Sequence, residues 1–447
     1  MFIHNTYISK MKKMEVFSTD LEEPKSESKP SSKTTKRIII LLICIIIILI
    51  SLIIILIIKN NKDDDDDKEK KNGKKEEEEG PKQYTLEETI DFVRKAFLGE
   101  IYYNLTYADG TVENTFKLNG KNYREEIGEV NGNKDYESNS LNQYDLYMPY
   151  SALKTKKTKG ILLFVHGGAW IQGVKEEMSY LSQIYFEHEY IIANLDYTLL
   201  SEDLKDGSIY RIIDDISACI ANIKYRLKNQ GFNESELEVA IGGGSAGGHL
   251  SLLYGYLVKE PPLPIKFIID TIGPVNLETD DFYKIEKDED TLPDIEPETV
   301  NKAIKENTYK HANLTDDYIV RLLNLFIGNK YTKEELKGML KNNTIDKSNE
   351  KYIELFNKAK YGFPINWMEG KDIPILALYG GKDEMIGFIH FARLRETALK
   401  YNNTLQLVYS RYGGHGLSEF EHEEGIIAAK DFHFYMLKFC DDYFTKY

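Results

Sequence analysis

One serine in the sequence is surrounded by glycine and alanine. Residues 241–250 read IGGGSAGGHL, so Ser245 is the centre of a G-x-S-x-G pattern that covers residues 243–247. A serine hydroxyl at its ordinary pKa is a poor nucleophile, so chemistry at Ser245 requires a base, and an acid that orients the base. The pentapeptide alone is weak evidence, because Gly-Ser-rich turns are common.

A late histidine and an aspartate have suitable positions for these two roles. His415, in RYGGHGLSE, lies in a glycine-bounded loop directly after a predicted strand, and Asp383, in ALYGGKDEM, lies just past another. We expect His415 to be the base and Asp383 the acid. The alternatives are a surface loop histidine and a turn or helix-cap aspartate. Five other histidines fall in predicted helices and are poorer candidates: His188, His249, His390, His422 and His433.

A second glycine pair can supply hydrogen-bond donors. Residues 164–170, FVHGGAW, end an apolar run in two glycines, so the backbone can approach a substrate closely. Acyl transfer needs preorganised amides for the oxyanion, and we expect these from Gly168, Ala169 and Ala246. The alternative is a tight strand-to-helix turn with Trp170 in the core.

The elements around these residues alternate between strand and helix patterns. A serine lifted on a sharp turn between a buried strand and an apolar helix matches the nucleophile elbow. An amphipathic helix is predicted over 84–99. Strands are predicted at 144–149, 160–168, 190–197, 237–244, 265–274, 373–381 and 404–410, and further helices at 176–188, 209–229, 246–258, 387–401 and 419–446. The alternation predicts an α/β fold, a mostly parallel sheet with helices on both faces.

A long interruption separates two of the predicted strands. Residues 277–370 are acidic at first and helical later, and they are too many for a loop. We expect a helical cap insertion over the carboxyl ends of the strands, where α/β proteins bind ligands. The alternative is an insertion that packs elsewhere and serves stability.

The N-terminal part of the chain has a different amino-acid composition. Residues 38–58 are almost purely Ile and Leu, long enough for a helix to cross the hydrocarbon layer. They predict a single transmembrane helix, preceded by a disordered tail (1–37) and followed by a charged linker (59–81) and the catalytic domain (82–447). A cleaved signal peptide is disfavoured by the length of the run and by the tail before it. The predicted localisation is a single-pass membrane protein of type II, with the catalytic domain lumenal or extracellular.

Composition excludes some partners. The 447 residues include 72 acidic and 57 basic side chains, a formal net charge of -15, which disfavours nucleic acid. Three cysteines form no metal-binding spacing, and a bridge between Cys219 and Cys440 stays open. The oligomeric state is likewise open.

These motifs resemble the α/β-hydrolase superfamily, in particular the esterase group with HGG-x-W and G-x-S-A-G-G. That group includes feruloyl-esterase-like, kynurenine-formamidase-like and hormone-sensitive-lipase-like enzymes. The resemblance covers residues 140–446 and includes NLDYTLL, where it implies structural roles for Asp196 and Tyr197. The order Ser245, Asp383, His415 is the order of the superfamily's nucleophile, acid and base.

The resemblance implies a hydrolase of carboxylic esters or amides that needs no metal and no cofactor. Two positions depart from the pattern: Gly244 stands where many relatives have an acid, and Ala169 stands where lipase-like members have a third glycine. The sequence therefore predicts a membrane-anchored serine carboxylic ester hydrolase with a small-molecule substrate. The alternatives are an N-formyl amide hydrolase, with the same triad, and a non-catalytic adhesion protein on a hydrolase scaffold.

Overall fold

The structure is a computed structural model. It describes residues 16–17, 99–107, 117–118, 121–122, 142–202, 207–277, 283–285, 309–311, 315–381, 383, 385–410, 413–415 and 423–445. All of them belong to one of the two units into which the chain divides, Met1–Ser18 together with Ile90–Tyr447. The other unit, Thr19–Thr89, lies outside the described residues.

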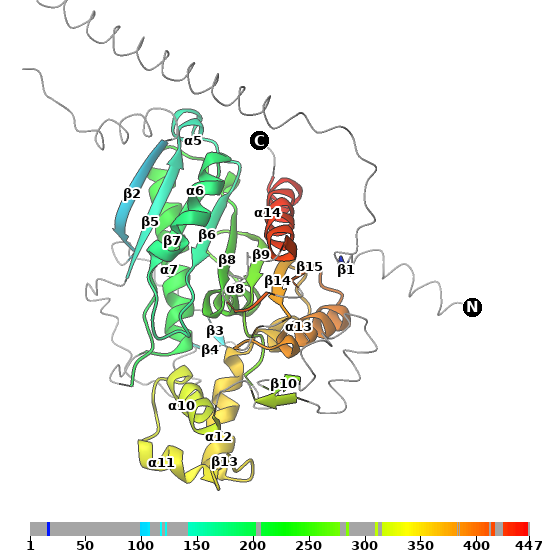
Figure 1. Cartoon of the computed structure of the whole chain (residues 1–447). Helices are drawn as coiled ribbons and strands as arrows, with labels where there is room; N and C mark the ends of the chain where they lie inside the picture. The colour runs from blue at the N-terminus through cyan, green and yellow to red at the C-terminus, as the bar shows by residue number, and fades with distance from the viewer. Residues whose placement is uncertain are drawn as a thin grey trace, which may run out of the picture. The chain divides into compact units, whose positions relative to one another are not determined.

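Nine of the described strands form one sheet, in the order β1-β15-β14-β9-β8-β6-β7-β5-β2 (Figure 1). From β1 to β7 neighbouring strands are parallel, whereas β5 pairs antiparallel with β7, and β2 pairs antiparallel with β5. The strands are β1 (Val16–Phe17), β2 (Gly99–Thr106), β5 (Gln143–Pro149), β6 (Ile161–Val165), β7 (Ile191–Leu195), β8 (Val239–Gly244), β9 (Ile265–Thr271), β14 (Ile375–Gly380) and β15 (Leu405–Ser410).

Helices cover both faces of this sheet. They are α5 (Tyr150–Thr155), α6 (Ser179–Glu187), α7 (Ile209–Asn229), α8 (Ala246–Leu257), α13 (Phe388–Tyr401) and α14 (Glu423–Tyr443), with short 3-10 helices η1 (Lys175–Met178) and η2 (Glu234–Glu236). The buried residues form two hydrophobic clusters. One contains side chains of α7, α8 and α13, and the other contains side chains of α6 and α14.

The central strand β6 explains why there are two clusters. Ile161, Leu163 and Val165 belong to the cluster of α7 and α8, whereas Leu162 and Phe164 belong to the cluster of α6 and α14. Side chains alternate between the faces of a strand, so a strand buried on both sides reads as a continuous apolar run. The predicted mostly parallel sheet with helices on both faces is confirmed.

The interruption between β9 and β14 has structure of its own. Its described helices are α10 (Asp316–Phe326), α11 (Lys333–Gly338) and α12 (Glu350–Ala359), followed by the 3-10 helices η4 (Lys360–Gly362) and η5 (Pro364–Trp367). Three small antiparallel pairs also occur: β10 (Tyr283–Ile285) with β11 (Tyr309–His311), β12 (Leu340–Lys341) with β13 (Thr344–Ile345), and, outside the insertion, β3 (Lys117–Leu118) with β4 (Lys121–Asn122). That the insertion acts as a cap stays a prediction.

The predicted elements from residue 144 onward agree with these bounds within a few residues. The sequence missed β2, which begins at Gly99, the residue taken as a helix stop, and it missed α5. The helix predicted over 84–99 lies outside the described residues except for Gly99. Cys219 and Cys440 are both buried and free, so the open question of a bridge between them is answered in the negative.

The prediction of a single-pass membrane protein is contradicted. Among the residues that the structure describes, no helix has both the length and the apolar character needed to cross a membrane. The stretch 38–58, where the sequence predicts the span, lies outside that described part. We therefore withdraw the transmembrane helix from the fold class and the localisation that was drawn from it.

Candidate active site

Ser245 occupies the sharp turn between β8 and α8. Its backbone has φ 54° and ψ -120°, a conformation that side-chain-bearing residues rarely adopt. Two backbone hydrogen bonds hold Ser245 in this strained conformation. Its amide donates to the carbonyl of Thr271 (2.8 Å), and its carbonyl accepts from the amide of His249 (3.1 Å). The turn leaves the Ser245 side chain half-buried at the carboxyl end of the sheet.

The glycines around Ser245 are required by close backbone contacts. A Cβ atom on Gly243 or on Gly247 would overlap the carbonyl oxygen of Val165 in the neighbouring strand. A Cβ on Gly248 would overlap a carboxyl oxygen of Asp270. Gly244 differs, because its nearest neighbour would be the carbonyl of Thr271 at 3.8 Å, an ordinary contact. The elbow pattern therefore has a steric cause at residues 243 and 247 that is absent at 244.

The structure brings the three predicted side chains together in one hydrogen-bonded chain. Nε2 of His415 lies 3.1 Å from Oγ of Ser245, and Nδ1 of His415 lies 2.9 Å from Oδ2 of Asp383. A carboxylate only accepts, so Nδ1 carries the ring hydrogen and Nε2 is free to accept from the serine hydroxyl. The Asp383 side chain is fully buried, and that of His415 is 24% exposed.

Asp383 is held in place by its own loop. Its Oδ1 accepts hydrogen bonds from the amides of Met385 and Ile386, both at 2.8 Å. The loop that carries His415 presses against the end of β14, since a Cβ on Gly380 would overlap the carbonyl of Gly413. These contacts fix the carboxylate and bring the two loops within hydrogen-bond reach.

Three of the remaining histidines are engaged elsewhere. His249 accepts from the indole N–H of Trp170 (3.2 Å) and donates to the carbonyl of Gly362 (2.8 Å), and burial lowers its pKa to about 3. His390 contacts the amide of Val275, and burial lowers its pKa to about 3 as well. His433 lies 2.8 Å from the phenol oxygen of Tyr185. His249 is thus a structural residue despite its place four residues after Ser245.

The glycine loop after β6 has an unusual backbone. Gly168, Ala169 and Trp170 all have positive φ, at 99°, 51° and 64°. Gly167 is the residue that touches the elbow: a Cβ there would lie 3.1 Å from the carbonyl of Gly244 and 3.5 Å from Cβ of Ser245. The loop therefore lies against Ser245, and the amides of Gly168, Ala169 and Ala246 stay predicted donors.

Residues 144–397, more than half of the chain, match the BD-FAE family. The chain belongs to the BD-FAE family.

Two curated relatives are the probable isoprenylcysteine alpha-carbonyl methylesterases ICMEL1 and ICMEL2 of Arabidopsis thaliana. The first is 31% identical over 116 residues, 26% of this chain and 22% of the relative. The second is 30% identical over 127 residues, 28% of each. The chain thus spans less than a third of the relatives' length.

Solved structures resemble this BD-FAE chain at low identity. A truncated carbohydrate esterase from gut microbiota is 14% identical, with a TM-score of 0.46, over 75% of this chain and 95% of that one. A thermophilic esterase of Thermogutta terrifontis is 14% identical, with a TM-score of 0.42, over 67% of this chain and 89% of that one. Neither likeness carries a functional inference.

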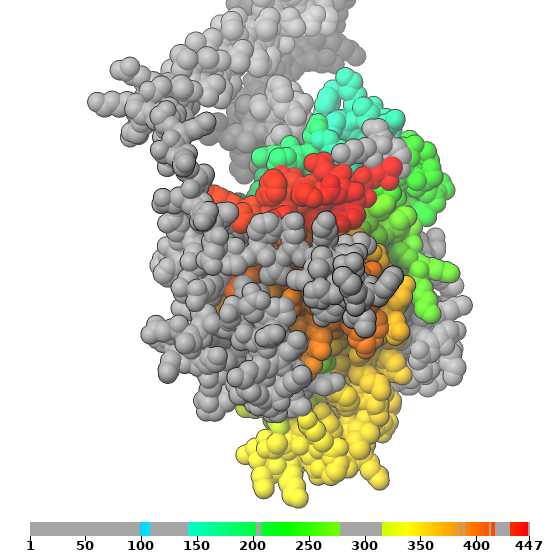
Figure 2. Space-filling model, turned by 90° about the vertical axis from the view of Figure 1, so that its right-hand side faces the viewer, coloured from blue at the N-terminus to red at the C-terminus, as the bar shows by residue number. Residues whose placement is uncertain are grey.

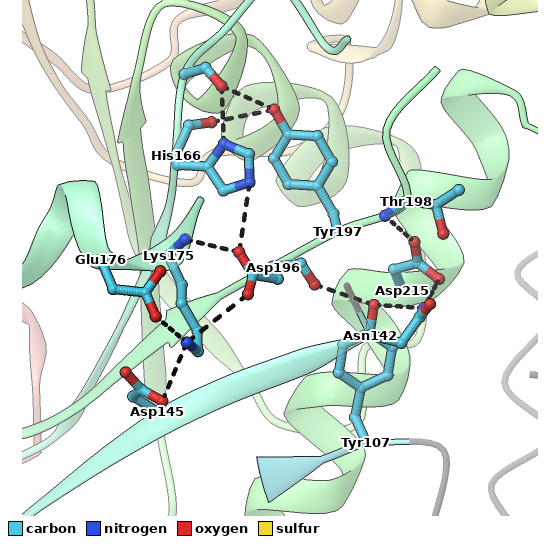
Figure 3. Close-up of polar contacts among 11 residues, drawn as sticks. Tyr107, Asn142, Asp145, His166, Lys175, Glu176, Asp196, Tyr197, Thr198 and Asp215 are labelled. Atoms are coloured by element: carbon cyan, nitrogen blue, oxygen red, sulfur yellow. Dashed lines mark hydrogen bonds and ion pairs between the residues drawn. The ribbon is translucent and has the colours of Figure 1, made fainter. Parts of the chain in front are cut away.

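A polar network holds the glycine loop of this BD-FAE chain from behind (Figure 3). The His166 ring stacks on Tyr197 with 4.2 Å between centroids, and the Tyr197 hydroxyl lies 3.1 Å from the carbonyl of Gly167. Nδ1 of His166 donates to the same carbonyl at 2.8 Å. His166 is fully buried, and burial lowers its pKa, so the ring is neutral. The position of Gly167 is thus set by two side chains.

Beneath this loop lies an ion cluster that the sequence analysis missed. Lys175 is 3% exposed, and its ammonium lies 3.6 Å from Asp145 and 3.8 Å from Asp196, with Glu176 as a third, exposed partner. The Lys175 amide also donates to Asp196 (2.6 Å). Burial alone lowers the pKa of Lys175, but the surrounding carboxylates outweigh it and the pKa is raised. Burial raises the pKa of Asp196 to about 6. The cluster ties β5, η1 and β7 together below His166.

Beside Ser245 lies a cavity of about 320 Å³. Its lining includes Ser245, His415 and Gly167, so it opens onto the hydrogen-bonded chain. The apolar part of its lining comes from two strands and from helices η1, α6 and α14: Phe164 of β6, Met178 of η1, Leu181 of α6, Ile269 of β9, Ile272 after β9, and Phe432 and Met436 of α14. No periodicity in the sequence indicated that these residues share a cavity.

The described residues contain no group of three His, Cys, Asp or Glu side chains arranged for a metal ion. That search did not include the rest of the chain. The expectation that the reaction needs neither a metal nor a cofactor therefore stays a prediction.

Proposed function

We propose that this chain is a serine hydrolase that cleaves carboxylic esters of small molecules through an acyl-enzyme on Ser245. The observation that supports it is the hydrogen-bonded chain from Ser245 through His415 to Asp383, with distances of 3.1 and 2.9 Å. Membership of the BD-FAE family and the names of the curated relatives, which are methylesterases, agree with this proposal.

In the proposed reaction, His415 acts first as a base and then as an acid. Nε2 takes the proton of the Ser245 hydroxyl as Oγ attacks the ester carbonyl, and it returns that proton to the leaving alcohol. Asp383 keeps the hydrogen on Nδ1 and stabilises the imidazolium that forms. A water molecule, activated by His415 in the same way, then releases the acid and frees Ser245.

The negative charge that develops on the carbonyl oxygen needs fixed donors. We assign the amides of Gly168, Ala169 and Ala246 to this role. The amide of Ala246 is the first of α8, where backbone N–H groups have no partner within the helix. The positive φ of Gly168 and Ala169 and the contact of Gly167 with the elbow support a loop shaped to face Ser245.

Active-site labelling tests this proposal. A fluorophosphonate probe should label the wild-type protein, and Ser245→Ala should abolish both labelling and the hydrolysis of p-nitrophenyl butyrate. Ser251→Ala is the matched control. Ser251 is a buried serine of α8, the helix that follows Ser245, and its hydroxyl donates to the carbonyl of Gly247. It should retain labelling.

Three results would overturn the assignment in different ways. Labelling that survives Ser245→Ala would show that another residue is the nucleophile. A folded wild-type protein that neither reacts with the probe nor hydrolyses any ester would favour a non-catalytic interaction protein. Turnover of N-formyl aromatic amines in preference to esters would favour the amide-hydrolase alternative.

A further inference from the structure

The space around Ser245 is asymmetric. On one side of the sheet, the side of α6 and α14, the cavity of about 320 Å³ opens next to Ser245. Met178, Phe432 and Met436, which line it, also belong to the hydrophobic cluster of that face. None of the lining residues comes from the insertion as far as it is described, residues 277, 283–285, 309–311 and 315–370.

On the side of α7 and α8, buried aromatic side chains pack between the glycine loop and the insertion. Trp170, which is 4% exposed, packs edge-on against Phe326 of α10 with 4.9 Å between ring centroids. Its indole N–H donates to His249, which in turn donates to the carbonyl of Gly362. The insertion thus packs against the glycine loop and α8 with buried aromatic side chains.

In Figures 1 and 2, α14 and the described helices of the insertion lie at opposite ends of the domain. Figure 2 shows α14 (red) in the upper part of the face and α10 to α12 (yellow) at the bottom. The walls of the cavity and the insertion can therefore be varied independently by mutation.

From this arrangement, and on the basis of the proposed function, we propose that the ester's apolar part binds between α6 and α14, and that Leu181 and Met436 determine its size. The expectation that the insertion caps the substrate site stays a separate prediction. The ligand class is an uncharged apolar chain or ring, attached to either the acyl or the alcohol side of the ester.

The cavity volume limits the size of this group. An apolar cavity of about 150 Å³ holds benzene, so about 320 Å³ corresponds to roughly twelve carbon atoms. Each methylene transferred from water to an apolar site improves binding by about fourfold. We expect kcat/KM to rise at least about tenfold from acetate to hexanoate and to level off beyond about twelve carbons.

The test uses the full chain and two ester series. One series varies the acyl group of p-nitrophenyl esters, and the other varies the alkyl alcohol of acetate esters, so that the two sources of the apolar group are distinguished. Met436→Trp and the milder Leu181→Phe should remove the preference for long groups. Leu340→Phe is the matched control: Leu340 is also half-buried but lies in the insertion, and it should keep the wild-type preference.

A binding readout separates this inference from the proposed function. 1-Octanol should raise the melting temperature of the Ser245→Ala variant, because a ligand that binds only the folded state stabilises it. It should not raise that of Ser245→Ala combined with Leu181→Phe. If the labelling experiment shows an active enzyme but neither ester series shows a length preference, this inference is wrong and the proposed function stands. The same holds if Leu340→Phe changes the length preference as strongly as Leu181→Phe. If no ester is cleaved, the octanol result alone decides it.

Discussion

The phenol oxygen of Tyr379 lies 2.6 Å from a carboxyl oxygen of Asp270 and also 2.6 Å from the carbonyl oxygen of Gly273. A phenol has one hydrogen to give, and a carbonyl can only accept. Tyr379 is the donor in both contacts, so its single hydrogen is shared between the carbonyl of Gly273 and the carboxyl group of Asp270. Asp270 is completely buried, and this burial favours its neutral form and raises its pKa to about 7.

This relationship predicts a specific dependence of stability on pH. The folded pKa of Asp270 lies above the unfolded value of about 3.9, so its stabilising contribution is complete below pH 4 and is lost as the pH rises towards 7. The loss is on the order of 3–4 kcal/mol. Asp270→Asn removes the titration and should flatten the curve.

Urea unfolding of both proteins between pH 4 and 8 measures this effect. The exposed Asp441→Asn serves as the control and should follow the wild-type curve. Parallel curves for wild type and Asp270→Asn would mean that Asp270 is ionised in the folded state.

The elbow glycines should differ in their tolerance of alanine. Gly247→Ala places a methyl group on the carbonyl of Val165, a backbone atom that cannot move aside, and should destabilise the fold by at least about 3 kcal/mol. Gly244→Ala finds an ordinary contact at 3.8 Å and should change the free energy of unfolding by less than about 1 kcal/mol. Thermal melting of the two variants makes the comparison, and equal losses would refute the steric account.

The ion cluster under the glycine loop should be sensitive to loss of its cation. Lys175→Met leaves the buried carboxylates of Asp145 and Asp196 without their partner and should destabilise the protein by about 3–5 kcal/mol. Lys159→Met removes an exposed ion pair with Glu189 and should cost less than about 1 kcal/mol. Chemical denaturation at neutral pH measures both. A small loss for Lys175→Met would show that water replaces the lysine.

Two histidines near Ser245 should show opposite phenotypes. His415→Ala should lower ester turnover by at least about a thousandfold with little change in melting temperature. His249→Ala leaves the Trp170 indole and the Gly362 carbonyl without partners, which should destabilise the fold by about 2–4 kcal/mol. Turnover per folded molecule of His249→Ala should stay within about tenfold of wild type. Rates for both variants are normalised to the folded fraction from circular dichroism, and the reverse pattern would make His249 the base.

Local pattern was enough to predict the elements that position Ser245, Asp383 and His415. Each of these residues follows a short apolar run and lies beside a glycine or in a glycine-rich turn, and such turns have specific steric causes, as at Gly243 and Gly247. The strand β2 was missed because Gly99 has two interpretations. A glycine after a helical pattern is typical of a helix end, whereas Gly99, with φ 135°, closely approaches the carbonyl of Met148 at the start of β2.

Features built from distant segments could not be predicted. Phe164 and Met436 line one cavity although they lie far apart in the sequence. Asp270 had the pattern of an ordinary strand residue, and its hydrogen bond with Tyr379 depends on the pairing of β14 with β9. Asp145 and Lys175 meet in the same way, through the pairing of β5 with β7 and the fold of η1.

Trp170 connects the reaction centre to the stability of the insertion. It follows Gly168 and Ala169 directly, yet its ring is buried against Phe326 of α10. Excising the insertion would expose this indole to water and release the loop that carries the assigned oxyanion donors. A minimal catalytic domain therefore cannot be made by deleting residues 277–370, and a protease cut within that segment would be detected as a loss of turnover before the sheet itself unfolds.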